Sequence, residues 1–202
     1  PPLDYSRHGY WWQVKVWDAK GRPSTPSERQ SFRVVPQDLG GQWIGAISRH
    51  DARLPEGRFS NAVFKKEDFK QLWSPVDSLS SKSIMLRKTF STTGRRITDA
   101  VVYVSGLGHY ELNINGHAVG DAAFAPLWSE YDKTVYYNVY DVTTLLLSGN
   151  NAIHVLLGNG FFNVQRLNRY SKLQTSFGAP QLMLRMDINY SDGSSQTILS
   201  GE

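Results

Sequence analysis

Residues 101–162 read VVYVSGLGHYELNINGHAVGDAAFAPLWSEYDKTVYYNVYDVTTLLLSGNNAIHVLLGNGFF, and this stretch decides the fold. Within it, residues 110–115 (YELNIN) alternate apolar and polar side chains, the period of two expected of a strand with one buried and one solvated face. Asn115-Gly116 then interrupts the alternation, and both residue types tolerate the positive φ angles of a type I′ turn. We therefore predict a hairpin in which residues 117–120 pair with residues 111–114.

The same alternation recurs outward from this hairpin on both sides. It predicts further strands over residues 84–90, 97–105, 131–140, 152–157 and 182–188. Turn-forming residues separate them, namely Thr92-Thr93-Gly94, residues 148–151 and Ser191-Asp192-Gly193. A short helical turn is expected only after Asp141, which is a candidate N-cap. This spacing of short strands predicts an all-β domain, a two-sheet antiparallel β-sandwich of jelly-roll type.

A separate pair of strands precedes this region. Residues 10–16 and 31–35 show strand patterning, and the segment Asp18-Ala19-Lys20-Gly21 supplies a turn between them. The pair resembles the last two strands of a fibronectin type III domain, so we expect the other strands of that domain to lie outside this sequence. Residues 36–41 read as a linker because a proline and a glycine pair interrupt strand pairing. We therefore assign residues 1–35 to a leading β-hairpin of a truncated neighbouring domain and 36–202 to the sandwich.

Composition narrows the classes of partner. The net charge of +4 comes from basic residues scattered among acidic ones, which indicates a solvated surface and not a nucleic-acid-binding one. No apolar run approaches the roughly 18 residues of a membrane span, so we expect no membrane insertion. The absence of cysteine excludes disulfides and thiolate metal sites but leaves the compartment open, with an extracytoplasmic location favoured.

The ionisable residues give little sign of catalysis. Glu130 and Asp132 would share one face of a strand and form the best local carboxylate pair, but exposed strand charges explain them more simply. The five histidines have no close spacing that would place two ligands on one metal. No Gly-x-Ser-x-Gly motif is present either. The sequence therefore does not predict an active site in this chain.

Three phrases, VSGLGHYELNINGHAVGD, YNVYDVT and GNNAIHVLLGNGFF, resemble the N-terminal β-sandwich module of bacterial α-L-rhamnosidases, glycoside hydrolases that remove terminal L-rhamnose. The resemblance extends over residues 42–195. It implies that the catalytic acids of the parent enzyme lie in a separate (α/α)6 barrel. It also implies that this chain is a non-catalytic accessory module, which binds rhamnose-containing glycans or, alternatively, only braces the barrel and has no ligand of its own.

Sugar sites combine an aromatic face with polar groups that hydrogen-bond ring hydroxyls. Three loops carry such residues, and the candidates are Asp121, Trp128, Tyr131, Asn159, Phe162 and Asn163. The resemblance also points to a calcium ion near Asp121, although Ala122 and Ala123 add no oxygen ligand and calcium takes six to eight. Turn capping by Asp121 and packing of Trp128 within the protein remain as alternatives.

Overall fold

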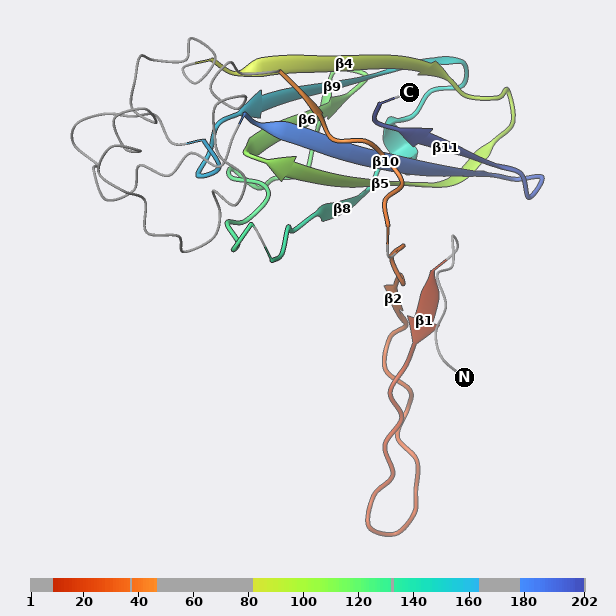
Figure 1. Cartoon of the computed structure of the whole chain (residues 1–202). Coiled ribbons are helices and arrows are strands. Elements are labelled where there is room, and N and C mark those ends of the chain that lie inside the picture. Colours follow the sequence, from red (N-terminus) through yellow and green to blue (C-terminus); the bar gives the residue numbers. More distant parts are fainter. Residues whose placement is uncertain (1–8, 37, 47–81, 132, 164–178, 202) are drawn as a thin grey trace, which may run out of the picture. The chain divides into compact units, whose positions relative to one another are not determined.

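The computed structural model describes residues 9–36, 38–46, 82–131, 133–163 and 179–201 (Figure 1). The chain divides into two compact units, Pro1–Leu39 and Gly40–Glu202. Both units are built from antiparallel strands, and the part of the chain that the structure describes contains no α-helix. None of its helical segments is long and apolar enough to cross a membrane.

The first unit contains one strand pair. Strand β1 (Tyr10–Trp12) pairs with β2 (Gln30–Phe32), and the rings of Tyr10 and Phe32 stack at 5.5 Å between centroids. Both strands are shorter than predicted. Beyond Trp12 the chain stays connected to its partner through serines, because the Ser27 hydroxyl accepts the Val14 N–H at 2.9 Å.

The second unit contains two antiparallel sheets. The strand order is β11-β10-β5-β8 in one sheet, with β3 also beside β10, and β4-β9-β6-β7 in the other. The strands are β3 (Ile44–Gly45), β4 (Ile84–Ser91), β5 (Ile97–Leu107), β6 (His109–Ile114), β7 (His117–Val119), β8 (Asn138–Asp141), β9 (Asn150–Gly158), β10 (Gln181–Tyr190) and β11 (Ser195–Leu199), and a 3-10 turn, η2 (Thr143–Leu145), follows β8. The prediction of an all-β domain with antiparallel sheets is confirmed.

The hairpin at Asn115-Gly116 is confirmed. Strands β6 and β7 pair with Ile114 opposite His117, and the two turn residues have φ angles of 52° and 85°. Asn115 does more than form the turn, because its side-chain oxygen accepts the Ala152 N–H at 2.9 Å and its amide donates to the Leu145 carbonyl. The turn is thereby attached to β9, an interior strand of its sheet.

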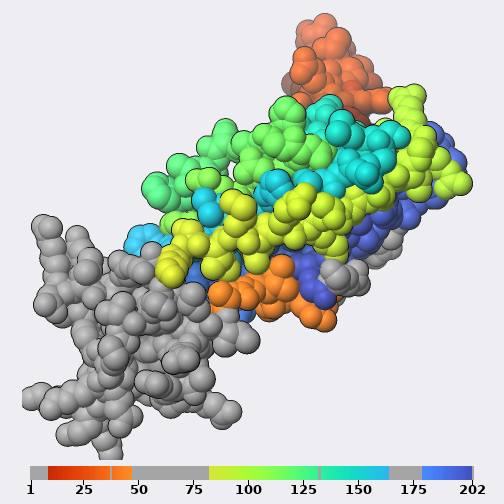
Figure 2. All heavy atoms as spheres, turned by 90° about the horizontal axis from the view of Figure 1, so that it is seen from above, coloured from red at the N-terminus to blue at the C-terminus, as the bar shows by residue number. Residues whose placement is uncertain are grey.

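The hydrophobic core lies between the two sheets. The alternation in β6 and β10 buries Leu112 and Ile114 from one sheet against Leu184 and Met186 from the other. In Figure 2 the yellow-green edge strand β4 runs between the cyan and green segments on one side and the blue of β10 and β11 on the other. The buried core is formed by Ala100, Val102, Val104, Tyr110, Leu112, Ile114, Val119, Ala125, Val142, Leu146, Ile153, Val155, Leu157, Leu182, Leu184, Met186, Ile188, Tyr190 and Ile198.

The segment that leads into β3 is held against the end of β11. The buried Ser200 hydroxyl donates to the Gln42 carbonyl at 2.7 Å and accepts the Leu184 N–H at 3.1 Å. The Gln42 N–H in turn donates to the Ser200 carbonyl. One serine side chain therefore connects three stretches of backbone that are far apart in the sequence.

The predicted strand over residues 131–140 is wrong in its extent, because only Asn138–Asp141 forms β8. The Glu130 carbonyl accepts the N–H groups of Lys133 and Thr134, which turns the chain before it can join a sheet. Tyr136 and Tyr137 alternate with neighbours as a strand would, but both are exposed loop residues.

Candidate functional site

Three loops converge at one end of the sandwich, where β5 turns into β6 (Figure 1). His109, at the start of β6, contacts the ring of Phe124 at 5.4 Å and that of Phe161 at 6.1 Å between centroids. The Ala125 carbonyl accepts the Tyr110 N–H, which fixes the loop that follows β7 to β6. We call the residues His109, Phe124, Leu127, Trp128 and Phe161 the loop face.

The apolar side chains of the loop face are largely exposed to solvent. Trp128 is 66% exposed, and Phe124, Leu127 and Phe161 are exposed to a similar degree. Phe124 and Phe161 both contact His109, and contiguous exposed apolar surface usually marks an interaction site in a soluble protein. The sequence predicted Trp128 as a candidate but missed His109, Phe124 and Phe161, since their proximity depends on three loops that meet only in the folded chain.

The structure brings four of the predicted residues together in two pairs. The ring of Tyr131 meets that of Phe162 edge to face at 5.1 Å, so the loop after β7 is joined to the loop after β9. The Asn163 side chain donates to the Asn159 side-chain oxygen at 3.0 Å. Phe162 and Asn163 are buried, which suits a role in holding the loop.

The other two predicted residues are open to solvent. Asp121 and Trp128 are exposed and take part in no hydrogen bond, ion pair or ring contact that the structure describes. Asp121 directly follows Gly120, whose φ of 82° and close approach to the Tyr140 ring leave no room for a side chain. A carboxylate and an indole with no internal partner are therefore available on the same loop.

Only one member of the Glu130 and Asp132 carboxylate pair lies within the described residues. Glu130 forms an exposed ion pair with Lys133 at 2.8 Å, and Asp132 lies outside the described residues. The described side chains also form no cluster of metal ligands. Across residues 9–36, 38–46, 82–131, 133–163 and 179–201, no group of three acidic or histidine side chains could hold a metal ion, and calcium requires six to eight oxygens.

Burial changes the acid–base behaviour of two residues in this region. Desolvation lowers the pKa of His109, because the imidazolium form would lose hydration between the two phenylalanine rings. Desolvation also raises the pKa of Tyr131, which keeps its hydroxyl neutral. The lowered pKa of His109 keeps its imidazole neutral at neutral pH, so the five side chains of the loop face carry no charge there.

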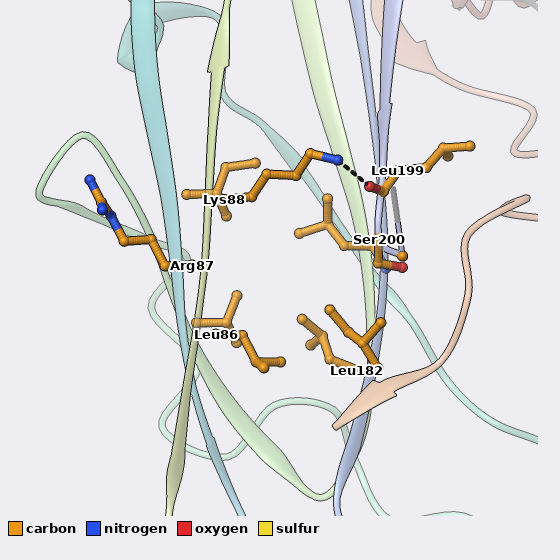
Figure 3. Close-up of a pocket in the computed structure, with 11 residues that line it drawn as sticks. Leu86, Arg87, Lys88, Leu182, Leu199 and Ser200 are labelled. Carbon is orange, nitrogen blue, oxygen red and sulfur yellow. Dashed lines mark hydrogen bonds between the residues drawn. The ribbon is translucent and has the colours of Figure 1, made fainter. Parts of the chain in front are cut away.

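A hollow lies between the sheets on the side where β4 faces β10 and β11 (Figure 3). Its volume is about 170 Å³, below the range of about 300–1,000 Å³ typical of small-molecule sites. Leu86 and Leu182 point into it from opposite sheets, and the Lys88 ammonium donates to the Leu199 carbonyl at 3.0 Å across its mouth. This apolar gap lacks the converging free polar groups that a sugar requires.

A family model and a curated relative identify one family. The model of the alpha-L-rhamnosidase N-terminal domain matches residues 95–202. A curated alpha-L-rhamnosidase of Formosa agariphila is 34% identical over 200 residues, which cover 96% of this chain and 20% of that protein. The chain thus spans about a fifth of the length of this relative.

Solved structures of alpha-L-rhamnosidases superpose on this chain. An alpha-L-rhamnosidase from Aspergillus terreus superposes with a TM-score of 0.71 at 27% identity, covering 98% of this chain and 20% of its own. A Streptomyces avermitilis alpha-L-rhamnosidase complexed with L-rhamnose has a TM-score of 0.57 at 25% identity, covering 94% of this chain and 18% of its own.

Proposed function

Because the chain belongs to the family of alpha-L-rhamnosidase N-terminal domains, we propose that it is a non-catalytic accessory module that binds rhamnose-containing glycans. The observation that carries the proposal is that one loop exposes both a carboxylate, Asp121, and an indole, Trp128, neither of which is bound by another described side chain. A relative crystallised with L-rhamnose supports the choice of sugar. The parent enzyme would hydrolyse terminal α-L-rhamnosides in its (α/α)6 barrel.

The proposed division of labour follows from exposure. Trp128 offers an aromatic face to the apolar side of the sugar ring, and Asp121 accepts hydrogen bonds from its hydroxyls. Tyr131 on the same loop and Asn159 on the loop after β9 would border the site, while buried Phe162 and Asn163 keep them in place through the ring contact and the amide hydrogen bond. No step of this proposal depends on calcium.

Calorimetric titration of the chain with L-rhamnose, with and without added calcium, tests the proposal. One monosaccharide buries little surface, so the dissociation constant should lie between roughly 10 μM and several mM. Asp121→Ala should weaken binding about tenfold or more, because a charge-assisted hydrogen bond contributes roughly 1.5 to 3 kcal/mol.

A matched tryptophan pair supplies the control. Trp128→Ala should abolish measurable binding, whereas Trp11→Ala, which removes an equally exposed indole from the first unit, should leave it unchanged. Equal affinity of the wild type and Asp121→Ala would place the site elsewhere.

The chain itself should release no rhamnose from an aryl α-L-rhamnoside between about pH 4 and 8, because glycosidases need two carboxylic groups facing each other across the substrate. Glu130 is instead bound to Lys133 on the surface. Release proportional to the amount of chain added, from a preparation free of longer enzyme, would overturn this part of the proposal.

A purely structural role is the alternative, and the loop face favours it. Phe124, Leu127 and Phe161 offer apolar surface that the catalytic barrel of the parent chain could cover. Absence of any heat or chemical-shift change with L-rhamnose, in the presence and absence of calcium, would favour this bracing role over binding.

Three finer assignments belong to the same proposal. We propose that the sandwich is a jelly roll and that residues 1–35 are the end of a fibronectin type III-like domain, as the antiparallel pair β1 and β2 would allow. We also propose an extracytoplasmic location, where polymeric glycans would be accessible.

A further inference from the structure

The outer face of the four-stranded sheet carries a polar groove that is separate from the loop face. Its volume is about 450 Å³, and it is lined by Arg87, Thr89, Phe90, Ser91, Asn115, Asn150, Asn151 and Ala152. Strand pairing fixes its position, because Ile84 lies opposite Leu157 near the loop after β9 whereas Ser91 lies opposite Asn150 at the other end. The groove is thus at the end of β4 away from that loop.

The shape of the groove follows from the register of β4 and β9. Alternate residues of β4, namely Arg87, Thr89 and Ser91, are exposed on the outer face. Opposite them lie His154, Ala152 and Asn150. The middle pair, Thr89 and Ala152, forms a floor between the Arg87–His154 pair and the Ser91–Asn150 pair. Figure 3 shows Arg87 on the side of β4 away from the gap between the sheets.

Arg87 is oriented but not neutralised. Its Nε donates to Nε2 of His154 at 3.0 Å, so the imidazole accepts through that nitrogen and fixes the plane of the guanidinium. Arg87 has no carboxylate partner, and its two terminal nitrogens donate to no group that the structure describes. None of the side chains that line the groove is acidic.

The remaining polar groups divide into occupied and available ones. Asn115 and Asn151 bond to each other and to backbone, so they serve the fold. The Ser91 hydroxyl donates to the Asn150 side-chain oxygen at 2.8 Å, which leaves the Asn150 amide hydrogens as donors. Thr89 adds a free hydroxyl on the floor.

We propose that this groove binds an acidic saccharide through its carboxylate. The two terminal nitrogens of a guanidinium match the two oxygens of a carboxylate, and such bidentate pairs are among the strong hydrogen bonds of proteins. Thr89 and Asn150 lie one and two rows from Arg87, where they can bond ring hydroxyls. The floor of Thr89 and Ala152 offers no aromatic ring for stacking, and Phe90 packs against the hydrophobic core. Recognition therefore depends on the charged group, and a neutral sugar binds far more weakly.

Chemical-shift titration of the 202-residue chain with D-glucuronate tests the inference, with D-glucose and acetate as comparison ligands. Glucuronate should perturb the amides of residues 87–91 and 150–154, glucose should perturb them at least about tenfold less, and acetate should bind more weakly than glucuronate. Arg87→Gln should weaken glucuronate binding about tenfold or more. Arg95→Gln is the matched control, since Arg95 is also exposed but is paired with Asp192 at 2.9 Å.

Any one of four results would overturn the inference. Equal responses to glucuronate and glucose would exclude recognition of the carboxylate, and equal binding of acetate would exclude recognition of a saccharide. Unchanged binding in Arg87→Gln, or an equal loss in Arg95→Gln, would exclude the groove. Because L-rhamnose carries no carboxylate, its titration at the loop face reports separately on the proposed function.

Discussion

Gly116→Ala measures how much the central hairpin depends on its turn. Gly116 has a φ of 85°, and an added Cβ would meet no atom within 4 Å, so the substitution changes the backbone preference without a clash. The left-handed conformation costs a non-glycine residue about 1–2 kcal/mol, and the loss of freedom in the unfolded chain returns about 0.4–1 kcal/mol. The free energy of unfolding should therefore fall by up to about 1.6 kcal/mol, and by about 0.8 kcal/mol at the middle of both ranges.

Gly94→Ala is the matched control, because Gly94 also has open space around it but does not have a positive φ. This variant should leave the protein as stable as the wild type or stabilise it by up to about 1 kcal/mol. Urea unfolding followed by tryptophan fluorescence gives both values, and Gly116→Asn should recover most of the loss, since asparagine tolerates this conformation. Equal effects of the two alanine substitutions would refute the reasoning.

Three further predictions concern packing, pH and a buried hydrogen bond. Leu157→Ala should reduce the free energy of unfolding by about 2–5 kcal/mol, whereas Leu156→Ala, which truncates the neighbouring side chain on the outer face, should cost less than about 1 kcal/mol in the same denaturant titration. Burial lowers the pKa of His109, so the stability that its neutral imidazole contributes is present above about pH 6.5 and is lost as the pH falls through the folded-state pKa. In thermal melts from about pH 7.5 to 5, the melting temperature should therefore fall less in His109→Gln than in the wild type. Ser200→Ala should cost about 1–3 kcal/mol in urea unfolding, because it leaves the Leu184 N–H without its acceptor, and a neutral result would show that water replaces the hydroxyl.

Local patterns predicted the elements whose partners are close in the sequence. The alternation in residues 110–115 and the Asn115-Gly116 dipeptide together fix the β6–β7 register, since a shift by one residue would expose Leu112 and Ile114. The same reasoning identified β10 and its turn to β11. Alternation failed over residues 131–137, where the backbone of Glu130 captures the next N–H groups and ends the extended conformation.

The candidate site was only partly predictable, because its residues come from loops that are distant in the sequence. Loop chemistry identified Asp121 and Trp128, which are exposed as a ligand contact requires. It could not distinguish them from Phe162, whose ring is buried against Tyr131, because burial within a loop depends on a second loop distant in sequence. The sequence also could not predict that Arg87 lacks an acidic partner, since only the sheet register shows that His154 lies across from it.

The β5–β10 pairing has a consequence for how fast this domain reaches its folded state. Ile97 pairs with Tyr190, and β4 pairs with β9 across an interval that contains four other strands. Domains dominated by such long-range contacts have high contact order and fold in milliseconds to seconds, because each long loop must close before its contacts form. The two tight hairpins, β6–β7 and β10–β11, can form within microseconds, before the long loops close. Until the long loops close, the apolar side chains of β5 and β10 are exposed together, and aggregation competes with folding at that stage.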